Sequence, residues 1–122
     1  MSGTDLQAVY NLLAQYGLLL DRLDVDEWLD LFTDDAVLDV GGTPLDSRGK
    51  RRHLTMTAPR GLHVSNLPVI DGDLTSDQVH VTATFLFWNT QNRTTRIGWY
   101  DDRLRRVGNG WRFESRRINF LD

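Results

Sequence analysis

Apolar residues recur at helical spacing over residues 6–23, near the start of the chain. At about 100° per residue, one face of a helix here carries a stripe made of Leu6, Val9, Leu13, Tyr16 and Leu20. Thr4 followed by Gln7 matches a capping box, which predicts where this helix begins. Asp24 and Glu27 repeat the pattern, so we expect a second, shorter helix with one face formed by Trp28, Leu31 and Phe32.

A short strand and a less regular segment follow the two helices. The polar residues 33–35 are expected to separate the second helix from the next element. Residues 36–40 are typical of a strand, and Gly41-Gly42 is typical of a turn. Residues 43–61 contain prolines and glycines around a weakly amphipathic piece, where we expect a short helix or a rim loop. Four basic residues of this segment could meet an acidic ligand but are expected to lie on solvated surface: Arg48, Lys50, Arg51 and Arg52.

From residue 62 onward, apolar residues alternate with polar ones, which is the period of a β-strand. Strands are predicted over residues 62–70, 78–90, 93–106 and 111–120. The tripeptide Gly108-Asn109-Gly110 predicts a tight hairpin between the last two. Helices followed by consecutive antiparallel strands indicate an α+β fold, in which a curved sheet covers the apolar stripe of the first helix.

The composition narrows the class of protein. A chain of 122 residues with 40% apolar and 25% charged residues is typical of one soluble globular domain, here residues 1–122. No apolar run approaches the ~20 residues that cross a bilayer, and residues 1–5 lack the basic and apolar parts of a secretory signal. We therefore expect a cytoplasmic protein without membrane contact. A net charge of −3 argues against nucleic-acid binding.

The reactive side chains of the sequence favour proton transfer. The absence of cysteine removes disulfides, thiolate metal sites and cysteine nucleophiles. The three histidines match no zinc spacing, and no serine lies in a nucleophile elbow. We therefore expect no metal and no cofactor. Carboxylates, imidazoles and phenols are left as the groups that could carry chemistry.

Asp21 lies at the edge of the apolar stripe, one turn beyond Gly17. A half-buried carboxylate needs a partner, because burying an unpaired charge is far costlier than forming an ion pair. His63 is the best candidate, since a strand over the first helix would bring it within reach of Asp21. Such a pair would hold the imidazole in one tautomer and let it act as a general base and then as a general acid. We predict Asp21 and His63 as catalytic residues; the competing interpretation is that His63 is a satisfied core histidine.

Further side chains are candidates for substrate binding. Tyr16 lies one turn before Leu20 and is the best candidate for a hydroxyl that polarises a substrate oxygen. Trp88 and Tyr100 could line a flat pocket for a ring-containing ligand, against the commoner interpretation that each is simply a core residue. His53 lies on the supposed rim and could contact the ligand or the solvent. His80 alternates with core residues, so we expect it to be exposed.

Three segments together carry a resemblance to a known family. They are LDRLDVDEWLDLFTDDAVLD, GLHVSNLPVIDGD and YDDRLRRVGNGWRFESRRINF, at residues 20–39, 61–73 and 100–120. In this order, and over nearly the whole chain, they resemble the SnoaL-like branch of the nuclear-transport-factor-2-like superfamily. The resemblance implies a cone-shaped α+β roll, in which N-terminal helices pack in a strongly curved, mixed and mostly antiparallel sheet around a pocket. It also implies a homodimer or a higher homo-oligomer.

The resemblance also implies site residues. Scytalone dehydratase and related polyketide enzymes of this superfamily pair an aspartate at the end of the first helix with a histidine on a strand of the pocket wall. Asp21 and His63 fall on these two positions, and His53 is comparable to a second pocket histidine. The dehydratase has a tyrosine where this chain has Leu20, and its other active-site tyrosine is replaced near Asp39. These differences argue against scytalone itself as the substrate.

Three hypotheses about function follow. The leading hypothesis is a cofactor-independent lyase or isomerase, of the dehydratase or cyclase type, that acts on a small hydrophobic cyclic carbonyl compound. Residues 26–36 and 104–122 also resemble the noncatalytic small subunit of aromatic-ring-hydroxylating dioxygenases, so an assembly subunit is the alternative. A noncatalytic binder of aromatic or polycyclic ligands is a third possibility. Limonene-epoxide-hydrolase-like chemistry is weaker, because its Asp-Arg-Asp arrangement is not evident here.

Overall fold

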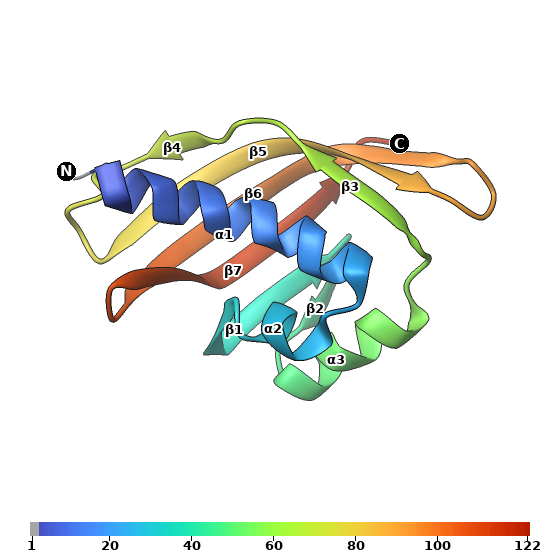
Figure 1. Cartoon of the computed structure of the whole chain (residues 1–122), viewed down its shortest axis with the longest axis horizontal. Coiled ribbons are helices and arrows are strands. Elements are labelled where there is room, and N and C mark those ends of the chain that lie inside the picture. Colours follow the sequence, from blue (N-terminus) through green and yellow to red (C-terminus); the bar gives the residue numbers. More distant parts are fainter. Residues whose placement is uncertain (1–2) are drawn as a thin grey trace.

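The computed structural model describes residues 3–122, and Figure 1 shows a long helix lying across one curved sheet. The helices are α1 (Gly3–Arg22), α2 (Val25–Leu29) and α3 (Arg48–Thr57). The strands are β1 (Phe32–Val40), β2 (Thr43–Leu45), β3 (Gly61–Ser65), β4 (Val69–Asp71), β5 (Gln78–Asn89), β6 (Thr95–Val107) and β7 (Gly110–Phe120). The predicted α+β class is confirmed, with the helices at the start of the chain and the long strands at its end.

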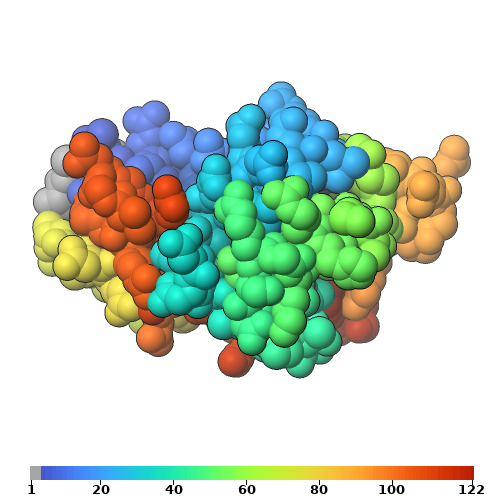
Figure 2. Space-filling model, turned by 90° about the horizontal axis from the view of Figure 1, so that it is seen from below, coloured from blue at the N-terminus to red at the C-terminus, as the bar shows by residue number. Residues whose placement is uncertain are grey.

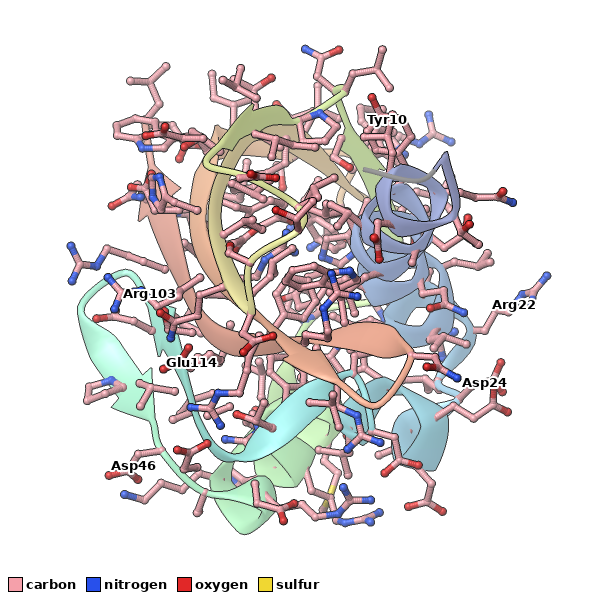
Figure 3. The ribbon with its side chains drawn as sticks, turned by 90° about the vertical axis from the view of Figure 1, so that its left-hand side faces the viewer. Tyr10, Arg22, Asp24, Asp46, Arg103 and Glu114 are labelled. Carbon is pink, nitrogen blue, oxygen red and sulfur yellow. The ribbon has the colours of Figure 1, made fainter. Side chains whose placement is uncertain are left out.

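The sheet is mixed and mostly antiparallel, as expected. Its strand order is β2-β1-β7-β6-β5-β3, with β4 also paired to β5. Only the β1–β7 pair is parallel among the strands of residues 3–122. This pair joins the first strand to the last and so brings α1 and α2 over the meander. Figure 3 shows the strands curving around an interior filled with side chains, while Arg22 and Asp46 point outward.

The apolar stripe of α1 faces this interior. Val9, Leu13 and Tyr16 are buried, which confirms the predicted face, and Leu6 and Leu20 pack at its margin. The buried face is wider than predicted, because Leu12 and Leu19 also belong to the core. No helix in residues 3–122 is long and apolar enough to span a membrane.

Several predicted boundaries are wrong in detail. Residues 62–70 are not one strand: β3 ends at Ser65 and β4 begins at Val69, and Pro68 between them has no N–H for a ladder. Residues 33–35 belong to β1, where the pairing with β7 is irregular between Phe32 and Val37. α1 already includes Gly3, so the helix begins before Thr4, where the sequence predicted its start. Asp24 does precede α2, but its side chain makes no capping hydrogen bond.

The segment after β2 forms α3, one of the two expected outcomes. Ser47 caps this helix by accepting a hydrogen bond from the Lys50 backbone N–H at 3.1 Å. Three of its basic residues lie in exposed ion pairs, as expected, formed by Arg48 with Asp30, Lys50 with Asp46 and Arg52 with Asp26.

The surface prediction is wrong for Arg51. Its side chain is buried, and one guanidinium N–H donates to the Ala36 carbonyl at 2.7 Å. The guanidinium carbon lies 5.1 Å from the centre of the Phe32 ring. Burial lowers the pKa of Arg51 from its ordinary value. Arg51 therefore anchors α3 to β1, and the charge pattern of the sequence could not distinguish it from its exposed neighbours.

Candidate functional site

The last turn of α1 and the strand β3 bring Asp21 and His63 together. Asp21 Oδ1 lies 2.5 Å from His63 Nδ1, and the His63 backbone N–H donates to Asp21 Oδ2 at 2.9 Å. The two side chains are 12% and 18% exposed. An ionised carboxylate can only accept, so the hydrogen of a neutral imidazole lies on Nδ1 and the lone pair on Nε2. The pair therefore presents one nitrogen that can take up a proton.

Gly17 allows this close approach of helix and strand. A Cβ atom at Gly17 would lie 2.8 Å from the His63 Cβ, closer than packed carbon atoms tolerate. On its other side, β3 pairs with β5, and the His63 ring lies 4.7 Å from the ring of Phe87. The space that a small residue leaves in α1 is thus filled by the partner of Asp21. The imidazole is held between a helix and an aromatic ring.

Asp21 and His63 border a cavity of about 330 Å³, within the range of small-molecule sites. Its wall is mostly apolar and includes Leu20, Leu54, Phe85, Phe87, Ile118 and Phe120. Leu54, Thr55 and Thr57 come from α3, which lies at the surface in green in Figure 2. The helices and the sheet therefore enclose a ligand-sized space with one acid–base pair in its wall.

Two tyrosines line the same cavity. Tyr16 and Tyr100 are 2% and 3% exposed, and their ring centres lie 5.7 Å apart. The Tyr16 ring lies edge-on to the His63 ring at 6.1 Å. Burial raises the pKa of Tyr16 to about 12, so its hydroxyl keeps its proton at neutral pH. Burial also raises the pKa of Tyr100. Both phenols can therefore donate hydrogen bonds to a bound molecule.

A buried ion pair lies beneath these tyrosines. Arg116 donates to both carboxylate oxygens of Asp102 at 2.8 Å. Its guanidinium carbon lies 4.2 Å from the centre of the Tyr16 ring and 3.7 Å from that of Tyr100. Burial opposes the charge of Arg116, but Asp102 raises the pKa of the guanidinium. Burial also raises the pKa of Asp102, and the two hydrogen bonds from Arg116 oppose this by favouring the carboxylate.

The structure places some of the other predicted site residues in the cavity wall and the rest outside it. Tyr16 and Tyr100 line the cavity, whereas His53 is exposed and does not. Trp88 is 38% exposed and lies on the sheet face opposite to Phe87, away from α1. His80 is exposed, as expected. Leu20, at the position where the dehydratase has a tyrosine, contributes an apolar side chain to the wall.

Sequence reasoning missed two arginines of the cavity wall, Arg60 and Arg96. Arg96 could have been found from the strand period, because it shares a face with Gly98 and Tyr100. Arg60 lies in the loop after α3, where no periodicity exists to indicate its direction. Within residues 3–122, no three acidic or imidazole side chains lie close enough together to hold a metal ion.

The fold and the cavity together define a class of protein. A helix-filled cone of bent sheet, with a ligand-sized cavity between α1, α3 and the sheet, is the cystatin-like or nuclear-transport-factor-2-like architecture. The sequence model of the SnoaL-like domain family matches residues 2–117. The chain therefore belongs to the SnoaL-like family. No match was found among curated proteins.

Solved structures share this fold. A protein from Novosphingobium aromaticivorans, named as the beta subunit of a candidate aromatic-ring-hydroxylating dioxygenase, is 28% identical with a TM-score of 0.77, over 93% of this chain and 87% of that one. A candidate scytalone dehydratase from the same organism is 21% identical with a TM-score of 0.81, over 100% and 89%. A cystatin-like protein of unknown function from Nostoc punctiforme is 20% identical with a TM-score of 0.86, over 98% and 93%. At 20% and 21% identity, the latter two establish the fold alone.

Proposed function

We propose that the protein is a cofactor-independent lyase or isomerase, of the dehydratase or cyclase type. Its substrate would be a small hydrophobic cyclic carbonyl compound. The observation that supports this most is the Asp21–His63 contact in the wall of an apolar cavity of about 330 Å³. A positioned imidazole with an apolar surrounding is suited to moving a proton to and from carbon.

The proposed reaction begins at a carbon next to the carbonyl group. His63 Nε2 takes a proton from this carbon, and the C–H electrons move to the carbonyl oxygen to form an enolate. Asp21 stabilises the imidazolium that results, and the Tyr16 hydroxyl donates a hydrogen bond to the oxygen. The imidazolium then returns the proton. In an elimination, the enolate electrons form the C=C bond between the α and β carbons, the C=O bond is restored, and the β C–O bond breaks as its oxygen takes the proton and leaves as water. In an isomerisation, another carbon of the conjugated enolate takes the proton.

The test measures the rate at which the α-protons of 2-tetralone, a neutral cyclic ketone, exchange with deuterium in D₂O. NMR monitors this exchange. The wild-type protein should accelerate exchange above the buffer rate. Because general base catalysis typically contributes ~10²–10⁴-fold, His63→Gln should lose most of this acceleration, and Asp21→Asn should lose a comparable share. His53→Gln changes an exposed histidine outside the cavity and should leave exchange unchanged.

The contradicting outcome is equally definite. Wild-type exchange that persists in folded Asp21→Asn and His63→Gln proteins would eliminate the pair as the catalytic group. Binding of 2-tetralone without any protein-dependent exchange would instead favour the noncatalytic binder of aromatic or polycyclic ligands.

The outer sheet face supports an additional proposal, that the protein forms homodimers or higher homo-oligomers. This face carries exposed apolar side chains on three neighbouring strands, namely Leu62, Val64, Leu86, Trp88, Ile97 and Trp99. An apolar patch of this kind is typical of an interface. A second copy could cover it face to face, since identical patches are complementary in a twofold arrangement.

Light scattering after size-exclusion chromatography tests this assembly. We expect a mass of at least two chains, and Trp99→Lys should shift it toward one chain. Arg22→Glu, on the opposite side of the molecule, is a control that should leave the mass unchanged. A monomer at all concentrations would contradict the proposal. Copurification with a larger iron–sulfur protein would instead support the assembly-subunit alternative, which the dioxygenase-subunit neighbour motivates.

A further inference from the structure

Two arginines stand in the wall of an otherwise apolar cavity. Arg60 and Arg96 line the space that Asp21 and His63 also border, and together these four are its ionisable side chains apart from the two tyrosines. We propose that Arg60 and Arg96 bind an anionic group of the ligand, so that the substrate is an amphipathic organic anion with an apolar ring body and a carboxylate or phosphate. This inference rests on the proposed function for the location of the site.

Arg60 is held by the end of α1. Its Nη2 donates to the backbone carbonyl of Asp21 at 3.2 Å, where the helix dipole favours a cation. No carboxylate within residues 3–122 forms an ion pair with Arg60. Arg48 and Arg52 of the preceding helix do have such partners. Arg60 therefore keeps donors and a full charge available at the cavity wall.

Arg96 is oriented by an aromatic ring. Its guanidinium carbon lies 4.0 Å from the centre of the Phe120 ring, itself part of the wall. The Nε donates to Asp122 Oδ1 at 3.0 Å, and the side chain is 51% exposed. The stacked guanidinium is thus fixed in plane, with further N–H groups left to donate. The guanidinium of Arg96 already donates to one carboxylate, that of Asp122, and a carboxylate is one of the two groups proposed for the ligand.

The charge balance of the wall favours an anion. Asp21 is the only carboxylate among the lining residues, and each of its oxygens already accepts a hydrogen bond from His63. Inside the cavity wall no carboxylate pairs with either arginine, although Arg96 pairs with Asp122, which lies outside the wall. Guanidinium groups bind carboxylate and phosphate through paired, charge-assisted hydrogen bonds. An anionic group near Arg60 and Arg96 would leave the ring body in the apolar interior beside Phe85 and Ile118.

The experiment compares 2-naphthoate with 2-acetylnaphthalene, which has nearly the same shape but no charge. Dissociation constants are measured by NMR titration at low salt. We expect 2-naphthoate to bind about tenfold more tightly, the effect of one good charge-assisted contact. Arg60→Gln and Arg96→Gln should each weaken 2-naphthoate severalfold and leave 2-acetylnaphthalene unchanged. The double variant should bind both probes equally.

Arg93→Gln is the matched control. It removes the same charge from the turn between β5 and β6, outside the cavity wall, and should leave the preference intact. Asp122→Asn removes the carboxylate that competes for Arg96 and should tighten 2-naphthoate. A third probe, 2-naphthyl phosphate, distinguishes the two anions: tighter binding than 2-naphthoate assigns the site to phosphate, and weaker binding assigns it to carboxylate.

The inference is overturned if both naphthalene probes bind equally to the wild-type protein, if neither binds, or if the preference survives loss of both arginines. Failure of the proposed function looks different, because that test uses a neutral ketone and follows exchange. If the protein prefers 2-naphthoate but does not accelerate proton exchange of 2-tetralone, the anion site is supported and the proposed enzymatic function is contradicted.

Discussion

Arg116 is a fully buried charge at the centre of an aromatic cluster. It is 1% exposed, it is bidentate to Asp102, and three aromatic rings surround its guanidinium, those of Tyr16, Tyr100 and Phe113. Its Nη1 has no hydrogen-bond partner in the described residues. A buried ion pair of this kind is stable as a pair and costly when halved, because the remaining charge is then buried alone.

Removal of the charge of Arg116 should therefore destabilise the protein more than removal of both charges. Arg116→Met should lower the free energy of unfolding by about 3–5 kcal/mol. The double variant Arg116→Met/Asp102→Leu should recover most of this loss, since no unpaired charge remains. Urea unfolding of the two single variants and the double variant measures the coupling. Additive losses would show that the two residues do not act as a unit.

At the scale of elements, the site is made by the contact of α1 with β3. α1 supplies Asp21 and β3 supplies His63, and Gly17 lets the two elements approach. β3 is also packed closely against its neighbour β5, since a Cβ atom at Gly61 would lie 2.0 Å from the Trp88 carbonyl oxygen. β3 is therefore confined from both sides, and the position of His63 follows from backbone packing as much as from its ion pair.

Gly17→Ala tests this confinement. Alanine stabilises an open helix position by about 1 kcal/mol relative to glycine, but here its Cβ would meet the His63 Cβ at 2.8 Å. We expect a net loss of about 1–2 kcal/mol together with loss of 2-tetralone exchange. Gly49→Ala in α3 is the control, because a Cβ there meets nothing within 4 Å; it should be neutral or stabilising. A stabilised and active Gly17→Ala protein would refute the role given to the α1–β3 contact.

At the scale of the whole molecule, acidic residues tie distant elements together. Asp5 of α1 pairs with Arg106 of β6, Asp26 of α2 with Arg52 of α3, and Asp35 of β1 with Arg105 of β6. In each case the hydrogen bond from arginine lowers the pKa of the carboxyl group. The unfolded chain lacks these contacts, so it binds protons more readily than the folded protein as the pH falls.

The stability should therefore decrease in acid. A depressed carboxyl pKa contributes stability that is complete above the ordinary value of about 4 and is lost as the pH falls through the lower folded value. We expect the urea midpoint to be nearly constant from pH 7 to pH 5 and to fall steeply below pH 4. Asp35→Asn should reduce the size of this fall. A midpoint that is the same at pH 7 and pH 3 would contradict the assignment.

The secondary structure and fold class could be predicted because their signals are local. Residues 6–23 repeat with the helical period, and residues 78–120 repeat with the strand period around a Gly-Asn-Gly turn. These periods reflect which face of an element is buried, and each can be observed within one segment. The same logic placed Asp21 at the edge of the helix face. The break between β3 and β4 also has a local signal, because Asn66 and Pro68 are typical of a turn, and the prediction of one strand over residues 62–70 overlooked it.

Only the tertiary structure decided which side chains from different segments meet. The sequence determined the α+β class, the apolar face of the first helix and a half-buried carboxylate that requires a partner. It could not decide that Arg51 is buried while its neighbours are exposed, or that Arg60 and Arg96 share a cavity with His63. Such contacts depend on strand order and on the distance between packed backbones, and no local period records either of them.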